Sequence, residues 1–302
     1  MTNDAPFLVT GATGRQGGGT ARALLAAGVP VRALVRDPAA PRAVALEQAG
    51  AELFRGDLRD RASLEAASRG VRGVFSIQTP LDLSIGAIDF ASELTQGTQL
   101  VEAARSNDVT RFVHTSVSGA GAWHRNAPGW DEGRWSTGDY FETKAAIQDL
   151  VAGAGFEAWT IIKPPTFMDH PLFDRSSVVD GRLVTVIAAD TEVPLIAPED
   201  IGAAAAAALL DPATFHGIEL DLAGDVLSVG EIAAVLSTAW QEPIVPDILT
   251  PEQAVAAGIP QPVVEAQEWF NVVGSPARPE QARSLGLRPI TFEEWALATY
   301  RD

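Results

Sequence analysis

The sequence predicts an α/β protein built on a doubly wound parallel sheet, with a smaller C-terminal α+β lobe. Short apolar runs alternate with helical stretches through the first half of the chain, the pattern of repeated β–α–β units. The first apolar run leads directly into a glycine-rich loop. After Pro164 the alternation becomes irregular, so we expect a second structural region there.

Each expected strand of the main sheet is a short run rich in apolar and β-branched residues. These runs lie at residues 6–10, 31–35, 52–54, 73–77, 111–116 and 158–162. The helical stretches between them lie at residues 20–27, 41–48, 62–68, 87–106 and 137–152. Right-handed crossovers place such helices on both faces of a parallel sheet.

The second region has short strands near residues 183–188 and 217–222, followed by helices with marked starts. Ser228, Thr250 and Thr291 each precede an acid or amide by three residues, which is the capping-box pattern. We therefore expect a sheet domain over 1–165, with a chain return near 190–225, and a smaller substrate or cap lobe over 166–302.

Composition excludes several classes of protein. The 302 residues are 46% hydrophobic and 20% charged, which is the composition of a folded domain and not of a disordered chain. The chain has no cysteine, which excludes disulfides, thiolate metal sites and thiol catalysis. Its four histidines lack metal-ligand spacing, so we expect no metal site.

The charge is unevenly distributed. The net charge of −17 argues against direct nucleic-acid binding, because that binding needs a basic face. Residues 1–61, however, hold eight arginines and six acids, whereas the rest of the chain carries a net −19. This N-terminal part could hold a small polyanion, or its arginines could be solvated helix surface.

The N-terminus lacks the basic stretch and apolar core of a secretory signal. The longest apolar run, residues 201–210, is too short to span a membrane. We therefore expect a cytoplasmic protein without membrane contact, either a monomer or a homodimer.

The glycine-rich loop is the strongest single motif. Gly11, Gly14 and Gly17 form GxxGxxG between the first strand and the first helix, and Thr13, Arg15 and Gln16 lie among them. Such glycines allow a tight turn, a close approach of backbone to pyrophosphate, and close helix–strand packing. The free N–H groups and the dipole of the following helix favour phosphate. The loop therefore predicts a dinucleotide site in a Rossmann-type domain.

Arg36 ends the second strand, where NAD-binding proteins place an acid for the ribose hydroxyls. Arginine there suits a 2′-phosphate, so NADP(H) is favoured over NAD(H), and Arg15 could add a second contact. The alternative is a solvated arginine beside Asp37. Asp57, after the third strand, could accept from the adenine amino group or could cap a helix.

Eight segments together resemble the NmrA-like group of atypical short-chain dehydrogenases/reductases. They are TGATGRQGGG (10–19), VRALVRDP (31–38), GDLRD (56–60), QTP (78–80), YFETKAAIQDL (140–150), IIKPPTFMDH (161–170), VPLIAPEDIG (193–202) and LGLRPITFEEW (285–295). The resemblance implies a Rossmann-type domain, a small C-terminal lobe and an NAD(P)(H) site. It does not imply one activity: members include reductases of quinones and of other small carbonyl or enone compounds, and catalytically silent redox-sensing regulators.

The resemblance also implies roles for single residues. It places Gln78, Thr79 and Pro80 on the loop that passes the nicotinamide ribose, and Lys144 near that ribose and the nicotinamide. Two departures from the family stand out. Tyr140-Phe141 replaces a frequent His-Phe, and Met168-Asp169-His170 replaces a frequent Met-Glu-Asn.

Tyr140 and Lys144 are spaced to share one helix face. A free tyrosine has a pKa near 10, and a nearby ammonium lowers it, so Tyr140 could protonate a carbonyl oxygen as hydride arrives. Related reductases add a hydroxyl after the fifth strand to orient that oxygen. Ser116 is the chosen candidate, with Thr115 and Ser118 as alternatives. Alternatively, Tyr140 only contacts cofactor or packs on its loop.

Aromatic and polar residues after two strands could line a substrate pocket; they are Trp123, Trp135, Phe167, Met168 and His170. The tryptophans could instead anchor their long loop to the body. His114, within an apolar strand, is expected to be a satisfied core residue, and Trp269 is expected in the core or at a subunit contact.

Two functional hypotheses follow. The first is an NADPH-dependent reductase of a small quinone, carbonyl or enone compound, with Tyr140 as proton donor. The second is a catalytically silent NAD(P)(H) sensor that binds a partner protein. A weaker third is isomerase or lyase chemistry on a bound cofactor without net redox change.

Overall fold

The computed structural model describes residues 4–82 and 87–300 of the chain. The chain divides into two compact units. The first unit comprises residues 1–117, 142–163 and 198–220, and the second comprises 118–141, 164–197 and 221–302. We expected a single boundary at residue 165, but the chain passes between the two units several times. The loop after the fifth main strand, residues 118–141, already belongs to the second unit.

The first unit contains a seven-stranded sheet in the order β13-β8-β7-β4-β1-β2-β3. Its strands are β1 (Phe7–Val9), β2 (Val31–Val35), β3 (Glu52–Arg55), β4 (Gly73–Ser76), β7 (Arg111–Thr115), β8 (Ala158–Lys163) and β13 (Ile218–Asp221). The neighbouring strands from β8 to β3 all pair in parallel. The strand order reverses beside β1, so the expected doubly wound, Rossmann-type sheet is confirmed.

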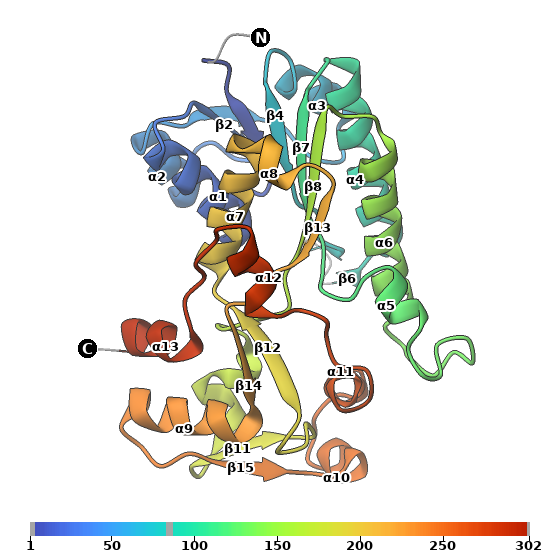
Figure 1. Ribbon diagram of the computed structural model, residues 1–302, viewed down its shortest axis with the longest axis vertical. Coiled ribbons are helices and arrows are strands. Elements are labelled where there is room, and N and C mark those ends of the chain that lie inside the picture. The colour runs from blue at the N-terminus through green and yellow to red at the C-terminus, as the bar shows by residue number, and fades with distance from the viewer. Residues whose placement is uncertain (1–3, 83–86, 301–302) are drawn as a thin grey trace. The chain divides into compact units, whose positions relative to one another are not determined.

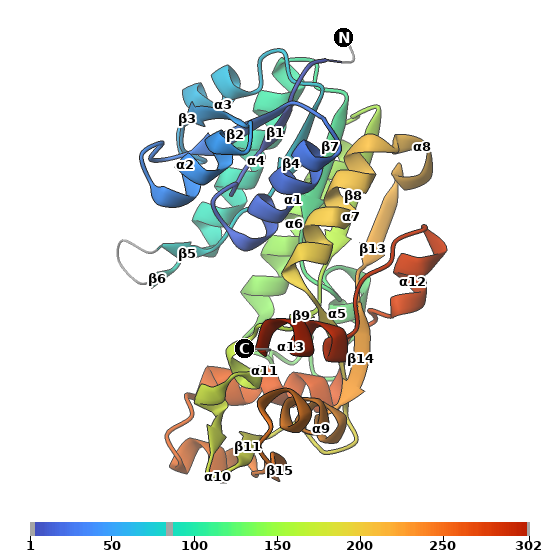
Figure 2. The same cartoon turned by 90° about the vertical axis from the view of Figure 1, so that its left-hand side faces the viewer.

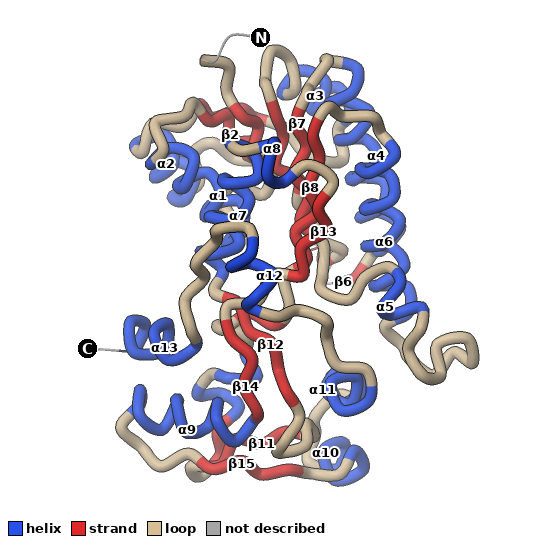
Figure 3. The backbone as a smooth tube through the Cα atoms, in the orientation of Figure 1, coloured by secondary structure: helices blue, strands red, loops and turns tan. Residues whose placement is uncertain are grey.

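Helices cover both faces of this sheet (Figures 1 and 3). They are α1 (Arg15–Ala26), α2 (Pro41–Gln48), α3 (Arg61–Ala67), α4 (Phe90–Ser106), α6 (Gly138–Gly153), α7 (Pro198–Leu210) and α8 (Pro212–Phe215). Figure 2 shows α1 beside α7. The two helices pack closely because each has a glycine at the contact, Gly19 in α1 and Gly202 in α7. A Cβ on Gly202 would lie 2.4 Å from the carbonyl carbon of Gly19.

The core under the α4 face joins the sheet to its covering helices. Leu8, Val74, Leu100, Phe112 and Ile161 are all completely buried there. Strand residues that are apolar on successive positions are typical of a parallel sheet covered on both faces. This core fixes the carboxyl ends of the strands, where side chains for chemistry can then be placed.

The second unit holds two small sheets, β14-β12-β9 and β10-β11-β15. Their strands are β9 (Thr166–Phe167), β10 (Val178–Val179), β11 (Arg182–Thr185), β12 (Glu192–Ile196), β14 (Asp225–Ser228) and β15 (Val245–Ile248). Its helices are α5 (Ala122–Arg125), α9 (Val229–Trp240), α10 (Pro251–Ala256), α11 (Gln261–Val272), α12 (Pro279–Ser284) and α13 (Phe292–Tyr300). The capping boxes predicted at Ser228, Thr250 and Thr291 are all formed.

Two predicted helix starts are wrong. Helix α1 begins at Arg15 and not at residue 20, because Gly17, Gly18 and Gly19 lie inside its first turns rather than in the loop. Helix α4 begins at Phe90, capped by Asp89, because residues Ala87–Ile88 form the strand β6 paired with β5 (Leu81–Asp82). No helix among residues 4–82 and 87–300 is long and apolar enough to cross a membrane.

Candidate functional site

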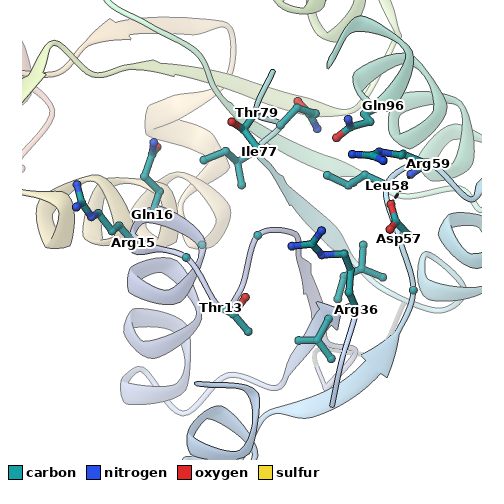
Figure 4. A pocket seen from close by; sticks show the side chains of 17 residues that line it. Thr13, Arg15, Gln16, Arg36, Asp57, Leu58, Arg59, Ile77, Thr79 and Gln96 are labelled. Atoms are coloured by element: carbon teal, nitrogen blue, oxygen red, sulfur yellow. Dashed lines mark hydrogen bonds between the residues drawn. The ribbon is translucent and has the colours of Figure 1, made fainter. Parts of the chain in front are cut away.

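A pocket of about 280 Å³ opens where the strands β1, β2, β3 and β4 end, entirely within the first unit (Figure 4). The loop after β1 supplies Gly11, Thr13 and Gly14, and the first turn of α1 supplies Arg15, Gln16 and Gly17. The end of β2 supplies Leu34 and Val35, and α4 supplies Gln96. The segments that follow β2, β3 and β4 supply Arg36, Gly56, Asp57, Leu58, Arg59, Ile77, Gln78 and Thr79. Most residues predicted from the sequence to bind a cofactor therefore line one cavity.

The glycine loop has the geometry that pyrophosphate binding needs. Gly11 has a φ of +58°, in the left-handed region that favours glycine. A Cβ on Gly17 would lie 2.4 Å from the carbonyl oxygens of both Thr10 and Gly11. Gly14, the N-cap of α1, offers no side chain to the first-turn N–H groups. Backbone amides and a helix dipole therefore face the pocket, as an anion requires.

The far side of the pocket, here called the arginine end, is formed by Arg36, Asp57 and Arg59. Figure 4 shows these three side chains together on the side opposite Arg15 and Gln16. Asp57 Oδ1 accepts from the backbone N–H of Arg59 at 2.9 Å. The N-cap of α3 is Asp60. The alternative that Asp57 caps this helix is therefore wrong, and its carboxylate instead lines the pocket.

A group of buried polar side chains, here called the buried cluster, lies where β4 and β7 end; it comprises Ser76, Gln78, Glu93, His114 and Lys144. Gln78 Nε2 donates to Ser76 Oγ at 2.9 Å, and Ser76 Oγ lies 3.2 Å from His114 Nδ1. Gln78 Oε1 and His114 Nε2 have no hydrogen-bond partner in the described chain. Since Gln78 lines the pocket, its orphaned carbonyl oxygen gives the cavity a buried acceptor.

His114 is a core residue, as expected, but only one of its ring nitrogens is satisfied. Burial, and then the neighbouring charge of Lys144, lower the pKa of His114 to about 3. The imidazole is therefore neutral at physiological pH and contributes no charge to the buried cluster.

Lys144 forms a buried ion pair that no sequence motif predicts. Its Nζ lies 2.6 Å from Oε1 of Glu93, and both side chains are at least nine-tenths buried. The second oxygen of Glu93, Oε2, has no hydrogen-bond partner in the described chain. The ammonium is thus matched by a carboxylate, an arrangement that offsets much of the cost of burying either charge.

The three candidate hydroxyls after β7 have different partners. Thr115 Oγ1 donates to Gln16 Oε1 at 2.6 Å, and Ser118 Oγ donates to Asp221 Oδ1 at 2.7 Å. Ser116 Oγ instead accepts from Gln148 Nε2 at 2.6 Å. Gln148 follows Lys144 by one turn of α6, so this helix face meets both the ion pair and the serine.

Tyr140 lies in the first turn of α6, among aromatic residues of the second unit. Its ring meets Phe141 edge to face, with ring centroids 5.4 Å apart. Phe141 stacks on Trp269 at 4.8 Å and on His124 at 5.2 Å. Trp130 and Trp135 also contact Trp269. The loop of residues 119–138, which carries these tryptophans, is thereby anchored to α11. Trp269 is largely buried, as expected for a core residue.

The residues predicted to line a substrate pocket have very different environments. Trp123 is exposed, whereas Trp135 is buried with its indole N–H bonded to the Pro128 carbonyl. Met168 is completely buried in the apolar core of the second unit. Phe167 is half-buried, and exposed His170 accepts from the Leu172 N–H.

The pocket residues fit a nicotinamide dinucleotide. The glycine cradle, formed by Gly11, Gly14 and Gly17 and too crowded at Gly17 for any side chain, offers backbone to the pyrophosphate. The orphaned acceptor of Gln78 and the two arginines of the arginine end match the ribose and phosphate groups of such a molecule. Pro80 does not line the cavity but accepts from the Asp89 N–H. In the described residues no cluster of three histidines or carboxylates could hold a metal ion.

Sequence reasoning missed several of these residues. Arg59 lies only two positions after Asp57, so the residues that directly follow Asp57 are the local signal that could have identified it. Gln96, Glu93 and Gln148 lie on long helices without any local signal. The contacts of Glu93 depend on which faces of α4 and α6 meet.

Comparisons with known proteins agree with this architecture. The model of the NmrA-like family matches residues 4–296. The NAD(P)H azoreductase of Xenophilus azovorans is 30% identical over 274 residues, which cover 89% of this chain and 87% of the relative. The NADPH-dependent quinone oxidoreductase of Escherichia coli, solved with NADPH, has a TM-score of 0.77 at 21% identity, covering 98% of this chain and 100% of its own.

A structure of NmrA, a negative transcriptional regulator, in complex with NAD has a TM-score of 0.76 at 20% identity, covering 98% of this chain and 96% of its own. At these identities the structural likeness shows the fold. The family model, by contrast, spans almost the whole sequence. The chain therefore belongs to the NmrA-like family, whose relatives include NAD(P)-binding oxidoreductases.

Proposed function

We propose that the protein is an NADPH-dependent oxidoreductase that reduces a small quinone, carbonyl or enone compound. The observation that carries this proposal is the pocket itself, with a glycine cradle on one side and two arginines on the other. The name of the azoreductase relative supports a reductive reaction with a nicotinamide cofactor.

The arginine end supports NADPH over NADH. Arg36 and Arg59 both line the pocket on the same side, and no acid replaces Arg36 at the tip of β2. Guanidinium groups suit a 2′-phosphate because they donate paired hydrogen bonds and remain charged. Asp57, whose Oδ1 is held by the Arg59 backbone, would accept from the adenine amino group through its other oxygen.

The buried cluster would receive the nicotinamide half. In a doubly wound sheet, a dinucleotide lies across the point where the strand order reverses, with its two halves on either side. The strands β4 and β7 lie on one side of β1, and β2 and β3 on the other. Gln78 Oε1 and Lys144 Nζ would then accept from and donate to the ribose hydroxyls.

Tyr140 would donate the proton. NADPH supplies a hydride, and one proton from the Tyr140 hydroxyl completes the reduction of a carbonyl to an alcohol. Ser116 is the best placed of the three hydroxyls to orient the substrate, because it accepts a hydrogen bond from Gln148 and can donate its own proton to a substrate oxygen. Trp123, Phe167 and His170 are proposed to contribute to the substrate pocket.

The test is steady-state NADPH consumption with a panel of quinones, ketones and enones, comparing Tyr140→Phe with Tyr300→Phe. These are the only two tyrosines in the chain, so the second variant is a matched control. We expect Tyr140→Phe to lower kcat about 100-fold or more and Tyr300→Phe to leave it unchanged. Full turnover by Tyr140→Phe on the best substrate would remove the proposed proton donor.

A second candidate function, a redox sensor without turnover, is favoured by the Lys144–Glu93 pair. Because the Lys144 ammonium is already paired with a carboxylate, it is less able to activate the hydroxyl of Tyr140. A sensor would bind its partner protein with different affinity in the presence of NADP⁺ and NADPH. Equal affinities by calorimetry, together with substrate turnover, would exclude it.

A further inference from the structure

The buried ion pair has a consequence for the oxidation state of the cofactor, and this inference rests on the proposed NADP(H) site. The nicotinamide ring is a cation in NADP⁺ and neutral in NADPH. A charge buried near that ring therefore distinguishes the two forms, since electrostatic interactions are stronger where water is excluded. An unmatched ammonium would disfavour the oxidised form.

We propose that Glu93, acting through Lys144, sets the relative affinity of the site for oxidised and reduced cofactor. The geometry that supports this is a contact of 2.6 Å between Lys144 Nζ and Glu93 Oε1, with the Glu93 side chain completely buried. Lys144 is held where β7 ends, because Gln148, one turn further along α6, bonds Ser116 at that strand end.

The other side chains of the buried cluster carry no charge. His114, from β7, is neutral because burial holds its pKa at about 3. Ser76 and Gln78, from the end of β4, are uncharged polar groups. Tyr140, one turn before Lys144 on α6, is a phenol. Glu93 on α4 and Lys144 on α6 are therefore the two charged groups of the buried cluster, and together they sum to zero.

Removing one member of the pair should shift the affinity ratio in a direction fixed by the charge that remains. Glu93→Gln keeps the shape of the side chain and leaves a cation, which opposes NADP⁺. Lys144→Met leaves an anion, which favours NADP⁺. The double variant, Glu93→Gln with Lys144→Met, is neutral again. If the pair had only a structural role, each variant would lower the affinity for both cofactor forms together. The two single variants would then not shift the ratio of the two affinities in opposite directions.

The experiment is calorimetric titration of the full-length protein with NADP⁺ and with NADPH, expressed as Kd(NADP⁺)/Kd(NADPH). We expect Glu93→Gln to raise this ratio about tenfold or more and Lys144→Met to lower it by a similar factor, the size of one buried charge interaction. The double variant should return to within about threefold of the wild-type ratio. Circular dichroism checks that each variant is folded.

An unchanged ratio in both single variants would overturn the inference while leaving the cofactor site intact. Should Glu93→Gln fail to fold, the sign of the change in Lys144→Met and the recovery in the double variant still decide the matter. Failure of the wild-type protein to bind either cofactor would instead contradict the proposed function.

Discussion

The arginine end and the buried cluster hold their charges in opposite ways. At the arginine end, Arg36 and Arg59 are exposed and lie beside the carboxylate of Asp57. In the buried cluster, Lys144 forms an ion pair with Glu93. Exposed charges lose little hydration on folding and remain available to a ligand, whereas buried charges must first be neutralised by each other. Affinity and stability are therefore expected to depend on different regions.

The buried pair should carry the largest effect on stability. Glu93→Gln should lower the free energy of unfolding by about 3–5 kcal/mol, because it leaves the ammonium of Lys144 buried without a carboxylate. Urea denaturation followed by tryptophan fluorescence measures this loss. The matched control is Glu280→Gln, which removes the exposed partner of Arg283 and should cost less than about 1 kcal/mol. Equal losses in the two variants would contradict the contrast between buried and exposed charges.

A substitution in the glycine cradle should weaken cofactor binding more than a substitution in the arginine end or in the buried cluster. Gly17→Ala should raise the Kd for NADPH about 100-fold, equivalent to roughly 2.7 kcal/mol, because the added Cβ meets two carbonyl oxygens at 2.4 Å. Gly153→Ala is the control, since a Cβ there meets nothing within 4 Å. Calorimetric titration of both variants gives the comparison. If Gly17→Ala bound NADPH as wild type does, the cradle would not hold the pyrophosphate.

The buried cluster should also make stability depend on pH. The pKa of His114 is lowered to about 3 in the folded protein, below its unfolded value near 6.5, so the unfolded chain binds the extra proton first. Stability from this group is complete well above pH 6.5 and should be lower by about 2 kcal/mol at pH 5 than at pH 8. Urea midpoints across this range test it. His114→Gln should flatten the slope; an unchanged slope would exclude His114 as its source.

The arginine end should have the smallest effect, and on affinity alone. Arg36→Ala should raise the Kd for NADPH about tenfold, or roughly 1.4 kcal/mol, and leave the Kd for NADH within about twofold. Its stability should be unchanged because Arg36 is exposed. Arg69→Ala, which removes an exposed arginine outside the pocket, controls for net charge. An equal loss for both cofactors would mean that Arg36 does not recognise the 2′-phosphate.

The same contrast explains what the sequence could predict. The main strands and the arginine end follow from local signals: apolar runs, glycines and the residues directly after each strand. Arg36, Asp57 and the glycine loop were found in this way, and the structure places them around one cavity. Capping boxes predicted three helix starts for the same reason, since their hydrogen bonds join residues three positions apart.

The buried cluster was out of reach because its contacts are long-range. Glu93 and Lys144 are 51 positions apart, and Gln148 and Ser116 are 32 apart. No spacing rule predicts which faces of α4 and α6 meet. The start of α1 was misplaced for a related reason: Gly17, Gly18 and Gly19 have low helix propensity, and only close packing against the loop and α7 explains glycine inside a helix there.

The measurement that tests the central claim most directly is calorimetric titration of the wild-type protein with NADPH and NADH under identical conditions. The pocket predicts saturable binding of NADPH at one site, about tenfold tighter than NADH because of the 2′-phosphate contacts at the arginine end. Absence of binding by either dinucleotide would contradict the claim that the glycine cradle, Arg36 and Gln78 form a cofactor site.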